Sequence, residues 1–204
     1  MRHITLATED ALSEAVGEKL IAEVKPRLEV GLRLRRDGFG YLKTRMRKFC
    51  EIARHQPVLV ITDLDRVACA ATLVRGWTAH DTPPTTLLLR VAVREVEAWL
   101  LADHDAMRTL LQRPRQILPP DPEALPEPKD ALIRLVGCHG PRSLREAIVP
   151  QPGVIAAQGL GYNNALVEFV RRTWSPHRAA QRSNSLARAR QRLRELAAPV
   201  SPGQ

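Results

Sequence analysis

Acidic side chains that follow predicted strands are the residues best suited to chemistry in this sequence. Asp63 and Asp65 come directly after the apolar and β-branched run at residues 58–62, which is typical of a strand buried on both faces of a sheet. In an extended segment these two side chains point to the same side, because side chains alternate with period two. Two converging carboxylates repel each other, and a divalent cation with oxygen ligands relieves that repulsion. The alternative is a strand that stops in a turn, where Asp is common.

Glu9 holds a similar position after a first predicted strand at residues 4–7. If the two strands are neighbours in a parallel sheet, Glu9 lies beside the two aspartates, at the edge where open α/β sheets bind ligands. The alternative is structural. Thr8 would then cap a helix predicted at residues 11–24, and the charge of Glu9 would favour the helix dipole.

A third acidic group lies in the helix predicted at residues 94–111. Glu95 and Glu97 flank its apolar stripe on opposite sides, so we expect only one of them to face Asp63. Asp103 falls within the stripe itself, where an unpaired carboxylate is costly. Either the helix breaks there and Asp103 caps a second segment, or Asp103 reaches a polar site.

The elements that must position these side chains alternate along the chain. Strands are predicted at residues 4–7, 28–34, 58–62 and 87–93, with helices at 11–24, 43–55 and 67–77 between them. This order predicts an α/β fold with a mostly parallel sheet flanked by helices. A proline-rich stretch at 114–128 then predicts an irregular connector. We therefore divide the chain into an α/β core at 1–112 and a connector with a C-terminal helical region, packed on that core, at 113–204.

The composition favours a globular protein with a polyanionic partner. The 204 residues are 44% hydrophobic and carry a formal net charge of +9, so we expect contact with nucleic acid. A basic, glycine-bearing loop at 35–43 and the basic helix after it add to the positive field. Charged residues interrupt every apolar run before the length of a membrane span, and the N-terminus lacks the features of a signal peptide. Three cysteines far apart form no zinc or disulfide pattern, so we expect a cytoplasmic protein without membrane association.

The order of the acidic residues resembles the Toprim fold, a Rossmann-like fold that places a Glu and an Asp-x-Asp pair at a sheet edge. More closely, the chain is similar to the Toprim-like bacterial family catalogued as domain of unknown function 4276. The segments that carry this resemblance are Thr8 with Glu9, residues 38–43, residues 60–65, residues 94–103, Pro128 with Lys129, and residues 161–163. The chain departs from the Toprim pattern at Asp10, where a Gly usually follows the Glu.

The resemblance implies Mg²⁺ or Mn²⁺ held by Glu9, Asp63 and Asp65 for phosphodiester chemistry, as in the nuclease part of overcoming-lysogeny proteins. Glu97, or with less support Glu95, would complete the metal ligands or act as base. Asp103 and the remaining glutamate would lie outside the metal ligands and orient them.

Basic side chains would neutralise the charge of the phosphate, and those we name are Lys43, Arg66 and Lys129. DNA is favoured over RNA as the nucleic acid. The resemblance also implies a partner ATPase of the overcoming-lysogeny or chromosome-maintenance type and a role in phage defence or DNA processing, and a homodimer is compatible with it. Two alternatives stay open: a non-catalytic nucleic-acid-binding or regulatory subunit of such an ATPase, and a nucleotidyl transferase.

Overall fold

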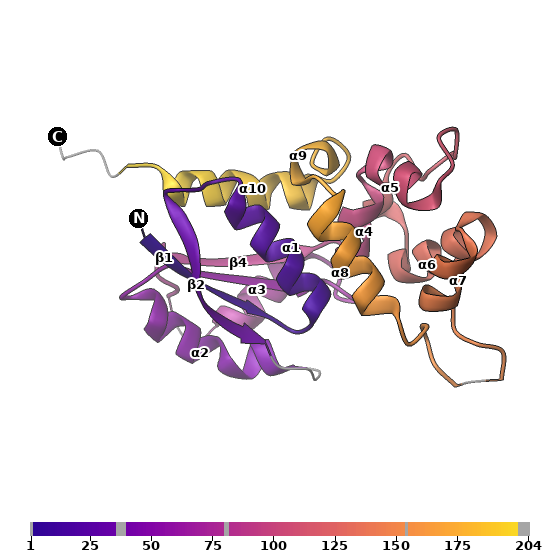
Figure 1. Ribbon diagram of the computed structural model, residues 1–204. Coiled ribbons are helices and arrows are strands. Elements are labelled where there is room, and N and C mark those ends of the chain that lie inside the picture. Colours follow the sequence, from indigo (N-terminus) through magenta and orange to yellow (C-terminus); the bar gives the residue numbers. More distant parts are fainter. Residues whose placement is uncertain (1, 36–39, 80–81, 154, 200–204) are drawn as a thin grey trace.

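A four-stranded parallel sheet forms the centre of the protein (Figure 1). The structure is a computed structural model, and it describes residues 2–35, 40–79, 82–153 and 155–199. The strands are β1 (Arg2–Thr8), β2 (Leu28–Arg35), β3 (Val58–Asp63) and β4 (Leu87–Ala92). They lie in the order β2-β1-β3-β4, and every pair is parallel. The predicted α/β fold with a parallel sheet is confirmed, and β2 is an outer strand as its half-polar pattern predicts.

The first three helices cover both faces of the sheet (Figure 1). Helix α1 (Ala11–Ala22) packs on one face, while α2 (Tyr41–Ala53) and α3 (Ala70–Thr78) pack on the other. From β1 the chain passes by α1 to β2, and from β3 it passes by α3 to β4, on the opposite side. The connections of the adjacent strands β1 and β3 therefore diverge. This divergence defines a topological switch point between the two strands.

The rest of the chain is helical and shares the core of the α/β part. Its elements are α4 (Val96–Leu101), α5 (His104–Leu111), the 3-10 helix η1 (Pro122–Ala124), α6 (Pro128–His139), α7 (Arg142–Ile148), α8 (Tyr162–Arg172), α9 (Pro176–Ala179) and α10 (Asn184–Ala197). Helix α8 lies beside α1, and α10 lies along β4 (Figure 1). Apolar residues of these helices join those of β1, β3 and α1 in one continuous cluster. The C-terminal helices are thus part of the same core.

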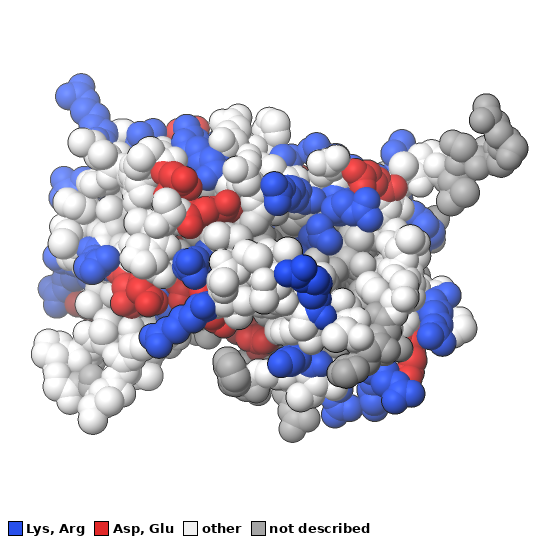
Figure 2. Space-filling model, turned by 180° about the vertical axis from the view of Figure 1, so that it is seen from behind, with Lys and Arg blue, Asp and Glu red and all other residues white. Residues whose placement is uncertain are grey.

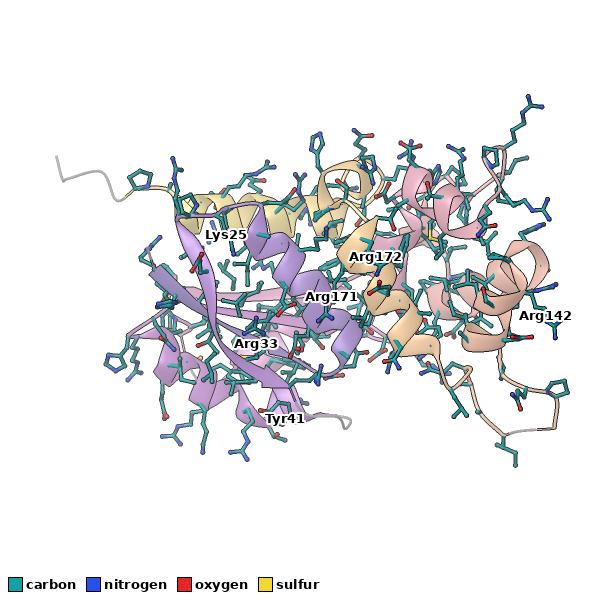
Figure 3. All side chains as sticks on the ribbon, in the orientation of Figure 1. Lys25, Arg33, Tyr41, Arg142, Arg171 and Arg172 are labelled. Atoms are coloured by element: carbon teal, nitrogen blue, oxygen red, sulfur yellow. The ribbon has the colours of Figure 1, made fainter. Side chains whose placement is uncertain are left out.

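Ion pairs link the helical region to the sheet. Arg33 of β2 and Arg171 of α8 both approach Glu18 of α1, at 2.7 and 3.9 Å (Figure 3). Nearer the C-terminus, the buried Arg190 of α10 binds both carboxylate oxygens of Glu23, at 2.7 and 2.9 Å. These contacts hold α8 and α10 against the layer that contains α1.

The carboxylate of Asp103, which the sequence places in the apolar stripe of the helix predicted at 94–111, has partners in the structure. The helix breaks there, and Asp103 caps α5 by accepting from the Ala106 N–H at 3.2 Å. Its fully buried carboxylate also accepts two hydrogen bonds from Arg178, each at 2.8 Å, and one from the Ser175 N–H at 2.8 Å. The prediction that Asp103 supports the acidic site is therefore wrong, because its carboxylate is engaged by α5 and α9.

Some local predictions need correction. Asp10, not Thr8, caps α1, since its side chain accepts from the Ser13 N–H at 2.7 Å. Helix α9 was not predicted. Four residues of the basic loop predicted at 35–43, numbers 36–39, lie outside the described residues. Among the described residues, no helix is both long enough and apolar enough to cross a membrane.

Candidate active site at the carboxyl edge of the sheet

Glu9 and Asp63 lie at the switch point between β1 and β3. Glu9 directly follows β1, and Asp63 is the last residue of β3. The two strands are paired, with Ala7 opposite Val60, so they end side by side. Because Asp10 is the helix cap, the carboxylate of Glu9 is not used for that purpose. Glu9 and Asp63 therefore lie at the same edge of the sheet, as the sequence predicts, because the strands that precede them are neighbours.

Asp63 is tied to the beginning of α4. One of its carboxylate oxygens, Oδ1, accepts from the Val96 N–H at 2.9 Å. This bond satisfies one of the free N–H groups that a helix start leaves, and it places the α4 terminus against the end of β3. The same loop is fixed by the Leu64 N–H, which donates to the carbonyls of Ala92 and Arg94, both at 2.9 Å. The Asp63 side chain is thereby held in position at the sheet edge.

Asp65 departs from the geometry expected of it. Strand β3 ends at Asp63, and Asp65 has a φ of 49°, in the left-handed region. The period-two argument that placed both side chains on one side therefore fails at Asp65. The alternative of a strand that stops in a turn describes this residue correctly. Asp65 is exposed, and its backbone is anchored by the Arg94 carbonyl, which accepts its N–H at 3.0 Å.

Glu97 is almost fully buried, with 5% of its surface exposed, and it is held by a tyrosine from a distant helix. The Tyr162 hydroxyl at the start of α8 donates to Glu97 Oε1 at 2.6 Å. The ammonium of Lys129 in α6 lies 5.0 Å from the centre of the Tyr162 ring, over its face. The buried Glu97 and Tyr162 and the half-buried Lys129 thus form a column contributed by three helices.

Glu95 turns toward α6. Its Oε2 accepts from the Lys129 N–H at 2.8 Å, so its charge sits at the N-terminus of that helix. Of the two glutamates, Glu97 is the one whose charge acts on Asp63. This agrees with the expectation that only one of them faces that aspartate. Glu95 therefore docks α6 beside the site.

The carboxylates at this edge raise one another's pKa values. We call Glu9, Asp63, Asp65, Glu95 and Glu97 the acidic edge. Burial, and after it the charges of Glu97 and Asp65, holds the pKa of Asp63 well above its ordinary value. Burial and then the Asp65 charge raise the pKa of Glu9. Burial raises the pKa of Glu97, and the Tyr162 hydrogen bond opposes that rise.

A pocket of about 660 Å³ opens beside the acidic edge. Its lining residues are Asp65, Arg66, Val67, Arg94, Glu95, Pro126 and Glu127. The Arg94 guanidinium donates to the Asp65 carbonyl at 3.0 Å, so one cation is fixed at the rim. The pocket therefore suits an anionic group that also binds a metal cation, such as a phosphate.

The three basic residues predicted to contact phosphate lie at different positions relative to the acidic edge. Arg66 lines the pocket, and Lys129 lies over the tyrosine ring behind it. Lys43 is exposed in the first turn of α2, and no hydrogen bond or salt bridge joins it to the acidic edge in the described part of the chain.

Several residues of the site were missed from the sequence. Arg94 lies at the start of the helix predicted at 94–111, Glu127 lies in the predicted connector, and Tyr162 lies in a segment that carries the family resemblance. None of the three was named as a site residue. A buried tyrosine must find a partner for its hydroxyl, and this was the available signal for Tyr162.

The acidic edge suits a hard cation by its donor atoms, all of which are carboxylate oxygens. None of its five members forms a salt bridge with a described basic residue. Within the described residues, however, no three acidic, histidine or cysteine side chains stand ready to hold one metal ion. The donors fit by charge and type, and side-chain rotation is needed to bring three of them around one ion.

Comparison with known proteins found no matching family model, no matching curated protein and no matching solved structure.

Proposed function

We propose that this chain is a divalent-metal-dependent phosphodiesterase that acts on nucleic acid. The observation that supports this most is the placement of Glu9 and Asp63 at the switch point of an open parallel sheet, where α/β proteins bind their ligands. The adjoining pocket carries Arg66 and Arg94 beside Asp65, a combination that suits a phosphate approached by a cation. Mg²⁺ and Mn²⁺ are the ions that match these oxygen donors.

Each residue of the site would have a separate role in the reaction. Glu9, Asp63 and Asp65 would hold the cation, which when bound would polarise the scissile phosphate. Burial raises the pKa of Glu97, which makes its carboxylate a better proton acceptor than an exposed glutamate. Tyr162 orients that carboxylate through its hydroxyl. The Arg66 guanidinium would neutralise charge on the phosphate from the pocket wall.

The nucleic acid is inferred from charge. The formal net charge is +9, and the outer side of α2 bears exposed basic residues, among them Lys43, Arg47 and Lys48. The positive surface would attract the polyanion. The bound divalent cation would neutralise the carboxylates of the acidic edge. DNA as the favoured substrate and an ATPase partner follow from the family resemblance and belong to the same proposal.

The test is a cleavage assay on labelled single-stranded and duplex DNA and RNA, with Mg²⁺ or Mn²⁺. Asp63→Asn and Glu9→Gln should each lower the rate by roughly a hundredfold. The Asn side chain keeps a carbonyl oxygen that can accept from the Val96 N–H, so the fold should persist. The matched control is Glu146→Gln on the exposed side of α7, which should cleave as the wild type does. Equal cleavage by the wild type and both site variants would contradict the assignment.

A non-catalytic nucleic-acid-binding or regulatory subunit is the second candidate. The observation in its favour is that no described trio of side chains is ready to hold a metal ion. Calorimetric titration of the wild type and Asp63→Asn with Mn²⁺ separates the two candidates. Metal uptake that depends on Asp63 favours the enzyme. Nucleic-acid binding without any metal uptake favours the binding subunit.

A further inference from the structure

The outer edge of β4 has no neighbouring strand in the described part of the chain. The Val58 N–H donates to the Thr86 carbonyl and the Leu64 N–H to the Ala92 carbonyl, at 3.0 and 2.9 Å. Backbone groups alternate sides along a strand, so the even-numbered residues from 86 to 92 face β3 and the odd-numbered ones face outward. An open strand edge of this kind is a template for pairing with another extended chain.

Both ends of this edge are already closed by the protein. The Leu87 N–H donates to the Pro84 carbonyl at 2.9 Å, and the Val93 N–H donates to the Ser185 hydroxyl oxygen at 3.4 Å. Between them, the backbone groups of Leu89 and Val91 face outward. A short extended segment could therefore pair with these two residues and no further.

A groove of about 430 Å³ runs over this open stretch. Its two walls differ in chemistry. The wall from α3 is apolar near the strand, with Ala70, Ala71 and Val74. The wall from the start of α10 is polar and basic, with Asn184, Ser185 and Arg188. Alternate side chains of an added strand would face these two walls in turn, because they point to opposite faces.

Basic residues outnumber acidic ones along the groove. Arg75, Arg90 and Arg188 line it, and so does Glu123, whose Oε1 accepts hydrogen bonds from Ser183 and Ser185. The Arg90 Nε is buried and has no hydrogen-bond partner in the described part of the chain. Burial, followed by the charge of Arg192, lowers the pKa of Arg90. Figure 2 looks onto this side of the molecule and shows a hollow bordered by blue side chains. Because three arginines face one glutamate in the lining, the groove favours an occupant with negative charge.

We propose that the edge of β4 binds an extended peptide segment of a partner protein in which acidic and apolar residues alternate. Its backbone pairs with Leu89 and Val91, its apolar side chains face α3, and its carboxylates face Arg188. Strand addition of this kind takes affinity from backbone hydrogen bonds and specificity from the alternate side chains. The site is separate from the acidic edge and does not depend on the proposed function.

Two other occupants fit less well. A nucleic acid strand would use the arginines, but the described residues that line the groove include no aromatic side chain on which bases could stack. A second copy of this chain would bring its own arginines against these, and like charges across an interface are unfavourable. A peptide uses the open backbone, the apolar wall and the charges together.

The test is fluorescence anisotropy of the full chain with a labelled peptide in which Glu and Val alternate. Arg188→Glu should weaken binding about tenfold, because it replaces an attraction with a repulsion. The control is Arg194→Glu, an exposed position of the same helix that does not line the groove, and it should bind as the wild type does.

Two methylated peptides test the backbone pairing directly. N-methylation of the amides along one edge of the peptide should abolish binding, and methylation along the other edge should leave it intact. Equal binding of both methylated peptides would overturn the proposal. So would failure of the unmodified peptide to bind, or its displacement by oligodeoxythymidine that binds with the same dependence on Arg188.

Discussion

Removal of the Tyr162 hydroxyl tests the column that Glu97, Tyr162 and Lys129 form. In Tyr162→Phe the ring stays and its contact with Lys129 is kept, so only the hydroxyl is lost. Glu97, 5% exposed, then loses the donor at 2.6 Å from its Oε1. A buried group left without its hydrogen bond costs about 1–3 kcal/mol. We therefore expect the free energy of unfolding to fall by about 1–3 kcal/mol at neutral pH.

The pH dependence of this loss identifies its cause. The hydrogen bond from Tyr162 opposes the rise in the pKa of Glu97, so it stabilises the ionised carboxylate. The loss should be largest above the folded-state pKa of Glu97 and should shrink as the pH falls through that value. Urea unfolding followed by circular dichroism over a series of pH values measures both quantities.

The matched control is Tyr41→Phe at the start of α2 (Figure 3). Tyr41 is half-buried and makes no hydrogen bond through its hydroxyl among the described residues, so its loss should stay within about 0.5 kcal/mol. The reasoning is refuted if Tyr162→Phe and Tyr41→Phe cost the same. It is also refuted if the loss in Tyr162→Phe does not change with pH.

Two further predictions concern stability. Asp103→Ala should lower the free energy of unfolding in urea by about 3–5 kcal/mol, because it leaves the Arg178 guanidinium without the buried carboxylate that binds it. The control is Asp105→Ala, because 73% of the Asp105 side chain is accessible in its ion pair with Arg108. This control should lower the free energy of unfolding by less than about 1 kcal/mol. The raised pKa of Asp63 means that the folded state binds its proton more tightly than the unfolded state does, so stability contributed by this group falls as the pH rises from about 4 through the folded pKa. Asp63→Asn should therefore flatten the decline of stability with pH, and an unchanged slope would contradict the burial and charge repulsion on which the prediction rests.

The sequence predicts the sheet well because the pattern of each strand reflects its place in the sheet. The apolar run at 58–62 signals a buried strand, and the half-polar pattern of β2 signals an outer one. Asp65 was left between two readings, because Asp after a strand is compatible both with a continued extended segment and with the left-handed turn that the structure shows at φ 49°. Asp103 was recognisable as an anomaly in the apolar stripe, yet its partner Arg178 lies 75 positions away. Long-range polar contacts of this kind have no periodicity from which to infer them.

The acidic edge depends on the C-terminal helices as much as on the sheet. Parallel strands alone place Glu9 and Asp63 at adjacent strand ends, but they offer nothing to hold Glu97, which is buried. A buried carboxylate is tolerated when it is hydrogen-bonded, and the donor here is the hydroxyl of α8. That hydroxyl is in turn positioned by the packing of α8 against α1, the helix that follows Glu9. The helical region therefore fixes the geometry of the acidic edge, and a protein truncated before α8 would lose the orientation of Glu97 even if its sheet still formed.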